Sequence, residues 1–299
     1  MPRTDQDDLV TEARGGSPDI DLLSSHELVE LMNDEDELVA SAVRQASAQI
    51  ADTIDAVVDR LERGGRLLYV GAGSSGAVAA LDAAECETTF ALPPGRVAAI
   101  VAGVGLESAA ERDAAEDDAE AGAKAVGDAV VTAADAVLGI SASGRTPFVV
   151  GAIEVALAAG ALTGAVVSAP DSPLSALVDH EIVVVVGPEF LAGSTRLKAG
   201  TAQKLVLNTI STVSMVRTGK TFGNLMVDVR ATNDKLRARV RRIVELATGT
   251  PPDEVEAALE AANGEAKVAI VSLLAEVDAH TARSRLDAAD GRIRAALGS

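Results

Sequence analysis

Two short loops that combine glycines with hydroxyl side chains are the first candidates for chemistry. The loop GAGSSG at 71–76 follows the apolar run LLYV, and the loop SASGRT at 141–146 follows the apolar run DAVLGI. Glycine lets a ligand approach backbone N–H groups closely, and the N-terminus of a following helix carries partial positive charge. The two loops therefore predict an anion site, with these candidate binding residues: Gly73, Ser74, Ser75, Ser141, Ser143 and Thr146.

The first loop also has the GxGxxG spacing of a dinucleotide site, since Gly71, Gly73 and Gly76 fall at those positions. Such a site expects an acidic residue at the end of the second strand, where it binds the ribose. Here the second apolar run ends AIVAGVG, without an acid. The pattern favours a compact phosphate monoester over a dinucleotide, while two ordinary tight turns remain an alternative.

Two glutamates are candidates for proton transfer. Glu85 lies in LDAAECETTF, where Leu81, Ala84 and Phe90 are expected to be buried, and Glu116 lies in the charged run ERDAAEDDAE. Apolar surroundings disfavour the charged form of a carboxylate and raise its pKa, which suits it to acid and base catalysis near neutral pH. From the residues alone, Glu116 also fits a solvated helix position and Glu85 a capping or packing position.

The three histidines do not predict a metal site. His26, His180 and His280 are far apart in the sequence and lack metal-ligand spacing, so neither a metal nor another cofactor is expected. The single cysteine, Cys86, excludes an internal disulfide and fits a reducing compartment. The cytoplasm is the expected location.

The order of apolar and alanine-rich segments predicts the fold that positions these residues. Five short apolar runs read as strands buried on both faces, and helical stretches at 75–87, 107–127 and 147–159 separate the first four. Alternating strands and helices predict a doubly wound α/β domain with a five-stranded parallel sheet. The predicted strands are 66–72, 97–103, 135–141, 162–168 and 181–187.

Three regions are expected along the chain. Residues 1–25 are polar and predict an N-terminal tail, and residues 26–232 form the main domain, which begins with one long amphipathic helix from Asp34 to Arg63. Residues 233–299 predict a small bundle of three or four helices. A helix-start signal lies at Thr250–Asp253, and Asn263–Gly264 ends that helix.

Charge and hydropathy exclude several classes of partner. The formal charge of 26 − 45 = −19 argues against binding to nucleic acid or to a membrane surface. Every long apolar run is interrupted by charged residues or glycine before it reaches membrane-spanning length, and the N-terminus lacks an apolar signal core. A soluble protein with a small-molecule ligand is expected.

Several motifs, taken together and in order, resemble the N-acetylmuramic acid 6-phosphate etherase family, which has the sugar isomerase (SIS) fold. The resemblance covers nearly the whole chain, and GSTRLKAGTAQK is its most specific block. The matching stretches are LVTEAR at 9–14, ELMNDED at 30–36, YVGAGSSG at 69–76, LDAAEC at 81–86, AEDD at 115–118, SASGRTPFV at 141–149, GSTRLKAGTAQKLVLN at 193–208 and GNLMVDVRATNDKLRAR at 223–239.

The resemblance implies a lyase of cell-wall amino-sugar recycling that converts N-acetylmuramic acid 6-phosphate to N-acetylglucosamine 6-phosphate and D-lactate. By motif match, Glu116 takes the C2 proton, and Glu85 protonates the departing lactate oxygen and then activates water. The hydroxyls of Ser75, Ser141, Ser143 and Thr146 hold the phosphate or sugar, and Lys198 supplies local positive charge. The resemblance also implies a homodimer with sites near the subunit interface.

Two other functions remain open at this stage. A non-catalytic sugar-phosphate sensor would resemble the glucokinase regulatory proteins, although those chains are typically longer and have two such domains. A sugar-phosphate isomerase would also remove a C2 proton, but it would release no lactate. Retention of both Glu85 and Glu116 favours the lyase over the sensor.

Overall fold

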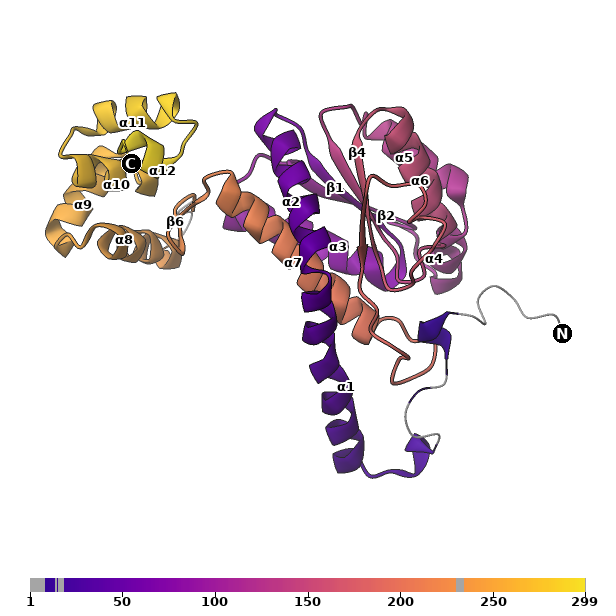
Figure 1. Cartoon of the computed structure of the whole chain (residues 1–299). Helices are drawn as coiled ribbons and strands as arrows, with labels where there is room; N and C mark the ends of the chain where they lie inside the picture. Colours follow the sequence, from indigo (N-terminus) through magenta and orange to yellow (C-terminus); the bar gives the residue numbers. More distant parts are fainter. Residues whose placement is uncertain (1–8, 14, 16–18, 230–233, 299) are drawn as a thin grey trace. The chain divides into compact units, whose positions relative to one another are not determined.

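The computed structural model describes residues 9–13, 15, 19–229 and 234–298, which form two compact units (Figure 1). The first unit comprises residues up to Ala84 together with Gly95–Ser211, and the second comprises Glu85–Pro94 and the chain from Thr212 onward. The predicted boundary between residues 232 and 233 lies outside the described residues, as do residues 1–8, 14 and 16–18 of the predicted N-terminal tail. Each unit is described by itself.

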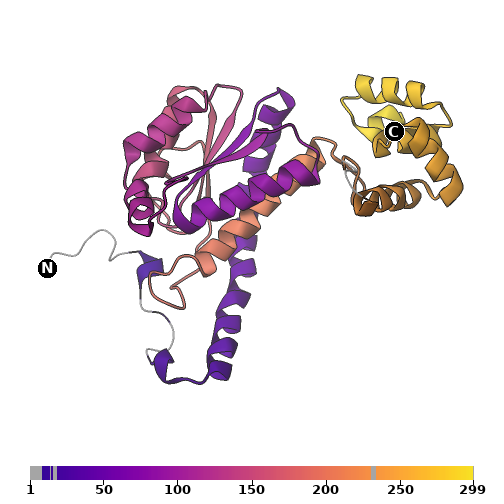
Figure 2. The ribbon, with the colours of Figure 1, turned by 180° about the vertical axis from the view of Figure 1, so that it is seen from behind.

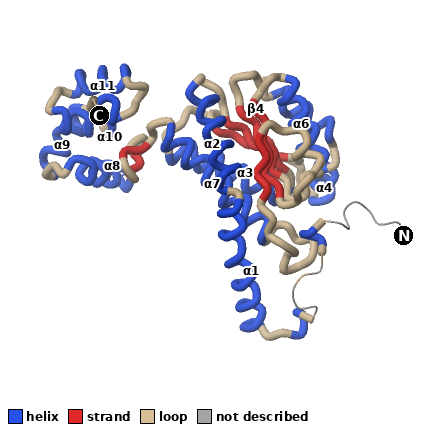
Figure 3. Tube along the Cα trace, in the orientation of Figure 1, coloured by secondary structure: helices blue, strands red, loops and turns tan. Residues whose placement is uncertain are grey.

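The first unit contains the predicted five-stranded parallel sheet, drawn as red segments in Figure 3. The strand order is β2-β1-β3-β4-β5, with every pairing parallel. The strands β1, β3 and β4 are buried at every position, as expected for apolar runs covered by helices on both faces. The strand bounds are β1 Leu67–Gly71, β2 Val97–Val101, β3 Ala136–Ile140, β4 Leu162–Val167 and β5 His180–Val183.

Helices cover both faces of this sheet, which confirms the doubly wound α/β fold. The helices α4, α5 and α6 lie on one face, and α2, α3 and α7 lie on the other, where Figure 2 shows α3 and α7 side by side. The helix bounds are α1 Ser25–Gln45, α2 Ser47–Glu62, α3 Gly73–Thr89, α4 Ala109–Glu116, α5 Ala119–Asp128, α6 Pro147–Ala158 and α7 Lys198–Arg217.

The predicted long helix from Asp34 to Arg63 is wrong in two respects. It begins earlier, at Ser25, because Ser24 and Glu27 form a capping box. It is also divided at Ala46, where the Ser47 hydroxyl donates to the Arg44 carbonyl oxygen (2.6 Å) and so takes one acceptor of the helix ladder. The segment is therefore two consecutive helices, α1 and α2.

Part of the N-terminal segment packs against the chain that follows β5. Leu9 and Thr11 are buried around the short 3₁₀ turn Val10–Glu12, and Gly193 N donates to the Thr11 carbonyl oxygen (2.9 Å). A second 3₁₀ turn, Ile20–Leu22, has no buried residue. Residues 9–13 are thus held in place although their composition predicted a tail.

The second unit contains five described helices rather than the three or four expected, and a short antiparallel hairpin precedes them. Their apolar side chains form a separate core that includes Val244, Val255, Ile270 and Leu286. The bounds are β6 Thr221–Phe222, β7 Leu225–Met226, α8 Asp234–Thr248, α9 Pro252–Ala261, α10 Ala266–Ala275, α11 Ala279–Ala288 and α12 Ile293–Ala296.

These helices repeat at an interval of 286 − 259 = 27 residues. The stretch LEAANGEAKVAI from Leu259 aligns without gaps with LDAADGRIRAAL from Leu286. The backbone follows the same interval, since positive φ angles occur at Gly249 (70°) and Glu276 (52°), and again at Asn263 (54°) and Asp290 (50°). The helices α8–α10 and α10–α12 therefore form two overlapping three-helix repeats that share α10. Their apolar side chains bury one common core.

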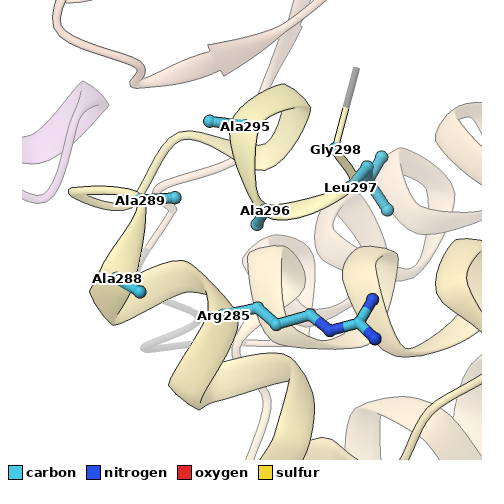
Figure 4. Close-up of a pocket in the computed structure, with 7 residues that line it drawn as sticks. All are labelled: Arg285, Ala288, Ala289, Ala295, Ala296, Leu297 and Gly298. Atoms are coloured by element: carbon cyan, nitrogen blue, oxygen red, sulfur yellow. The ribbon is translucent and has the colours of Figure 1, made fainter.

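A shallow depression of about 370 Å³ lies between α11 and α12 in this unit (Figure 4). Its lining is mostly alanine and glycine, with Arg285 as the charged side chain among the labelled residues. It contains none of the residues that the sequence predicted for the anion site. No described helix of either unit is both long enough and apolar enough to cross a membrane.

An ion pair between the half-buried Arg66 and the buried Asp135 joins the amino ends of β1 and β3. Arg66 donates to both carboxylate oxygens of Asp135, from Nη2 to Oδ2 (2.8 Å) and from Nε to Oδ1 (3.1 Å), and Thr132 N donates to Oδ2 (2.9 Å). Burial alone would raise the pKa of Asp135, but these hydrogen bonds outweigh it and lower the pKa to about 2. The carboxylate therefore stabilises the folded chain in its charged form.

We expect this contribution to disappear as the pH falls from about 4 to about 2, because an unfolded aspartate has a pKa near 3.9 and binds its proton first. The pKa difference corresponds to about 2.5 kcal/mol of unfolding free energy. Urea unfolding of the wild type and of Asp135→Asn, repeated across pH, measures it. A stability gap between the two proteins that stays constant below pH 4 would contradict this assignment.

Candidate active site

The two predicted anion loops lie at the same edge of the sheet. The strands β1 and β3 pair in parallel, with Gly71 opposite Ile140, so the loops after these strands start from neighbouring positions. The chain leaves β1 toward β2 on one side, whereas β3 lies on the other side, which makes this pair the topological switch point of the sheet. Ligands of open α/β sheets bind at such a point, beyond the carboxyl ends of the strands.

The first loop leads directly into α3, whose first turn contains Gly73, Ser74 and Ser75. Ser74 is exposed and Ser75 is half-buried. The first N–H groups of a helix have no carbonyl partner within the helix and point toward its N-terminal end. The first turn of α3 can therefore bind an anion through backbone N–H groups and two hydroxyls.

Glu116 lies against this first turn. Gly73 has a positive φ of 50°, and a Cβ atom at this position would lie only 2.6 Å from Glu116 Oε1, so glycine is required for the contact. The predicted helix 107–127 is in fact divided: α4 ends at Glu116, and Asp118 caps the start of α5 by accepting from Ala121 N (2.9 Å). That division places Glu116 at the end of a helix, beside the anion loop.

The environment of Glu116 suits a general base. Its side chain is half-buried. Burial raises the pKa of Glu116, and the negative charges of Asp113 and Asp117 raise it further. This shift brings the carboxyl group toward the pH range in which it can accept and return a proton, whereas the residues alone favoured a solvated helix position for Glu116.

The second loop gathers hydroxyls around Ser141. The buried Ser141 Oγ lies 2.8 Å from Thr146 Oγ1 and 3.5 Å from Ser143 Oγ, and it accepts from Gly144 N (3.1 Å). Thr146 is the residue before α6, which begins with Pro147. The three predicted hydroxyls of this loop therefore form one cluster at a second helix N-terminus.

The loop after β4 braces this cluster. Leu174 N donates to the Gly144 carbonyl oxygen (3.1 Å), and Ser168 N donates to the Ala142 carbonyl oxygen (2.9 Å). Gly144 has a positive φ of 64°, and a Cβ atom there would lie 2.1 Å from Ser172 Oγ. Ser172 is not among the residues predicted from the sequence, where its signal is limited to the serine-proline turn SAPDSP.

Lys198 lies at the first position of α7 and is buried. Its ammonium group pairs with Glu35 of α1, and Glu189 accepts from Lys198 N (2.9 Å) and Ala199 N (3.0 Å). The charge that the sequence predicted for the anion is therefore engaged by a carboxylate in this structure. Glu35 is 163 residues away along the chain, and no sequence signal connected the pair.

Glu85 lies further along α3 than the groups that meet at its first turn. It follows Gly73 by twelve residues, which corresponds to about 18 Å along the helix axis. Its side chain is exposed. The expected burial of Phe90 is confirmed, but Leu81 and Ala84 are exposed, because they lie on the same uncovered side of the helix as Glu85.

Within the described part of the chain, no group of three or more histidine, cysteine, aspartate or glutamate side chains could hold a metal ion. The polar groups at the carboxyl edge are instead hydroxyls, backbone N–H groups and carboxylates. The hydroxyls and backbone N–H groups can donate to a phosphorylated ligand, and the half-buried carboxylate of Glu116 suits proton transfer.

The chain is similar over nearly its whole length to proteins named N-acetylmuramic acid 6-phosphate etherase. The protein from Rubrobacter xylanophilus is 58% identical over 97% of this chain and 96% of its own length. The protein from Streptomyces avermitilis is 53% identical over 97% of this chain and 93% of its own length. A family model described as the glucokinase regulatory protein N-terminal SIS domain matches residues 49–157.

Solved structures share the sheet and its helices. A putative phosphosugar isomerase involved in capsule formation from Bacteroides fragilis is 21% identical, with a TM-score of 0.50 over 64% of this chain and 91% of that one. A phosphoheptose isomerase from Francisella tularensis is 20% identical, with a TM-score of 0.50 over 64% of this chain and 100% of that one. At this identity the likeness concerns the fold, which is of the SIS type.

We expect Gly144→Ala to lower the free energy of unfolding by roughly 2–4 kcal/mol, because a left-handed alanine is strained and its Cβ overlaps Ser172 Oγ. Urea unfolding measures the loss, and adding Ser172→Gly should recover the part due to overlap. Gly127→Ala is the control: Gly127 is exposed in α5 with no atom near the added methyl, so the variant should be slightly more stable. Equal stabilities for both alanine variants would contradict the packing described.

Proposed function

The chain belongs to the N-acetylmuramic acid 6-phosphate etherase family, and we propose that it cleaves the D-lactyl ether at C3 of N-acetylmuramic acid 6-phosphate. It is then an enzyme of the carbon–oxygen lyase class that forms N-acetylglucosamine 6-phosphate and D-lactate in cell-wall recycling. The observation that carries this proposal beyond the family name is the half-buried Glu116 carboxylate, held against the first turn of α3.

The reaction is an elimination followed by a hydration. In the open-chain aldehyde form of the sugar, the C2 proton is acidic because the resulting carbanion is delocalised into the carbonyl group. Glu116 takes this proton, the C3–O bond breaks, and Glu85 gives a proton to the departing lactate oxygen. Glu85 then takes a proton from water as its oxygen adds to C3, and Glu116 returns a proton to C2, so both carboxyl groups end as they began.

The phosphate is held by neutral donors in this proposal. The first turn of α3 supplies the N–H groups of Gly73, Ser74 and Ser75, and the second loop supplies Ser141, Ser143 and Thr146. Two helix N-termini then direct partial positive charge toward one dianion. We assign Lys198 to supporting this edge, through Glu35, rather than to direct contact. A phosphorylated sugar does not cross membranes unaided, which supports action in the cytoplasm.

Purified protein incubated with N-acetylmuramic acid 6-phosphate should release D-lactate. Glu85→Gln and Glu116→Gln should each lower kcat by at least about 100-fold, because each removes a proton-transfer group. Glu87→Gln in α3 and Glu120→Gln in α5 are matched controls at exposed positions and should keep full activity. Since the pKa of Glu116 is raised, the loss of kcat/KM at acid pH should begin above the range of an ordinary glutamate, about 4.3.

The alternatives give different results in the same experiment. A sensor resembling the glucokinase regulatory proteins, whose SIS domain model matches part of this chain, would bind the phosphosugar without releasing lactate. An isomerase would convert an aldose phosphate to a ketose phosphate. Binding without lactate in the wild type would contradict the lyase.

We also propose a homodimer, on the evidence of uncovered apolar side chains in the first unit. The first fourteen residues of α1 (25–38) include no buried side chain, and Figure 1 shows this part of α1 extending past the sheet. Exposed apolar side chains occur both on this part of α1 and at Leu81 on α3. A helical segment of this length that packs on nothing is only marginally stable in water, so a second subunit that covers it would stabilise it. The exposed side chains are Val29, Met32, Leu38 and Leu81.

A homodimer offers a way to bring both carboxylates to one sugar. Within a chain, Glu85 lies about 18 Å beyond Gly73 along α3. In the substrate, however, the ether oxygen is bonded to C3, which is the direct neighbour of C2. A second subunit that packs on the exposed side of α3 can supply its own Glu85. A two-fold interface would then form two equivalent sites, each with Glu116 from one subunit and Glu85 from the partner.

Mixing the two inactive variants tests this arrangement. Dimers of Glu85→Gln and Glu116→Gln, dissociated and reassociated together, should recover about a quarter of wild-type activity, because half the dimers are mixed and each has one intact site. Refolded single variants are the control. A purified mixed dimer without activity would place both glutamates of a site in the same chain, and a monomer in solution would exclude the dimer.

A further inference from the structure

A buried carboxylate outside the proposed chemistry links three elements of the first unit. Asp82 is 5% exposed, on the covered side of α3. Its Oδ2 accepts from the Tyr69 hydroxyl of β1 (3.0 Å), and its Oδ1 accepts from the Ser211 hydroxyl of α7 (3.0 Å). All three residues are buried, so these hydrogen bonds are shielded from water.

A third donor extends the group along α7. With its amide oriented to satisfy both neighbours, Asn208 donates from nitrogen to Asp82 Oδ1 (3.0 Å) and accepts on oxygen from Lys204 Nζ (2.7 Å). A continuous chain of polar contacts thus runs from β1 through α3 to the exposed ammonium of Lys204. Figure 2 shows α3 and α7 side by side, as these contacts require.

The cost of burying a carboxylate explains why Asp82 and its donors restrict the position of α3. A buried carboxylate is costly unless hydrogen bonds replace its hydration, and the three donors come from two other elements. Rotating α3 about its axis, or sliding it, would break these bonds and leave buried polar groups unsatisfied. An apolar side chain could fill the same space but would tolerate several positions of the helix. The carboxylate therefore selects one position of α3.

We propose that Asp82 is a positioning residue for the reaction, because it holds α3, and with it the first turn of this helix, in register with β1 and α7. This inference rests on the proposed function. The turn it holds includes Gly73, on which the Glu116 carboxylate lies, and Glu85 follows Asp82 by three residues in the same helix. Loss of the carboxylate lets α3 shift, which misplaces both the phosphate donors and the proton-transfer groups.

The test compares Asp82→Asn with Asp135→Asn, which removes another buried and hydrogen-bonded carboxylate, at the amino ends of β1 and β3. Both variants should be less stable in urea. At a temperature where both are fully folded, Asp82→Asn should lose at least tenfold in kcat/KM, through a lower kcat and a higher KM for N-acetylmuramic acid 6-phosphate. Asp135→Asn should stay within twofold of the wild type in both constants. Equal kinetic constants for the two variants would overturn the proposal.

A milder pair of variants keeps the test decisive if Asp82→Asn does not fold. Ser211→Ala removes one donor to Asp82, whereas Ser214→Ala, one turn later in α7, removes a buried hydroxyl that has no hydrogen-bond partner among the described residues. The first should raise KM and lower kcat, each by at least twofold, and the second should change neither. Identical kinetics for the two serine variants would also overturn the proposal.

Failure of the proposed function can be told apart from failure of this inference. If the wild type releases no lactate, titration calorimetry with N-acetylglucosamine 6-phosphate replaces the kinetics. Binding that weakens in Ser211→Ala and Asp82→Asn, but not in Ser214→Ala and Asp135→Asn, would support positioning of the phosphate donors by Asp82. Binding equally strong in all four variants would overturn it.

Discussion

The parallel pairing of β1 with both β2 and β3 is the constraint on which the candidate site depends. Because β1 and β3 are parallel neighbours, the loops after them open at one edge of the sheet, and because the chain leaves β1 toward β2 on the other side, this pair is the switch point. The helix α4, which lies in the crossover between β2 and β3, then ends beside the first of these loops. A glycine-rich helix N-terminus and a half-buried carboxylate thus meet through topology rather than through sequence proximity.

The electrostatics of this edge differ from those of the chain as a whole. The protein has a formal charge of −19, and Lys198, the cation expected at the site, is paired with Glu35. The groups at this edge that can attract an anion are instead two helix N-termini, glycine N–H groups and clustered hydroxyls. They do so without adding a buried cation. Burial raises the pKa of Glu116, and the negative charges of Asp113 and Asp117 raise it further because they disfavour a third charge nearby.

Two buried aspartates stabilise different parts of the first unit. Asp135 joins the amino ends of β1 and β3 through Arg66, and Asp82 joins the middle of β1 to α3 and α7. Each is surrounded by donors, so each favours one arrangement of its neighbours over others. Their different locations make them a natural pair for separating stability from catalysis.

The sequence by itself determined the five parallel strands, the two glycine-rich loops at their carboxyl ends and the family, because apolar periodicity, glycine positions and ordered motifs are local signals. The 27-residue repeat was also readable from the sequence, through the paired LEAANG and LDAADG stretches, although composition alone suggested only a small bundle. Tertiary structure alone decided which distant groups meet. Glu116 reaches Gly73, Glu35 takes Lys198, and Asp82 binds Ser211, because packing and hydrogen bonds between remote segments leave no mark in local spacing.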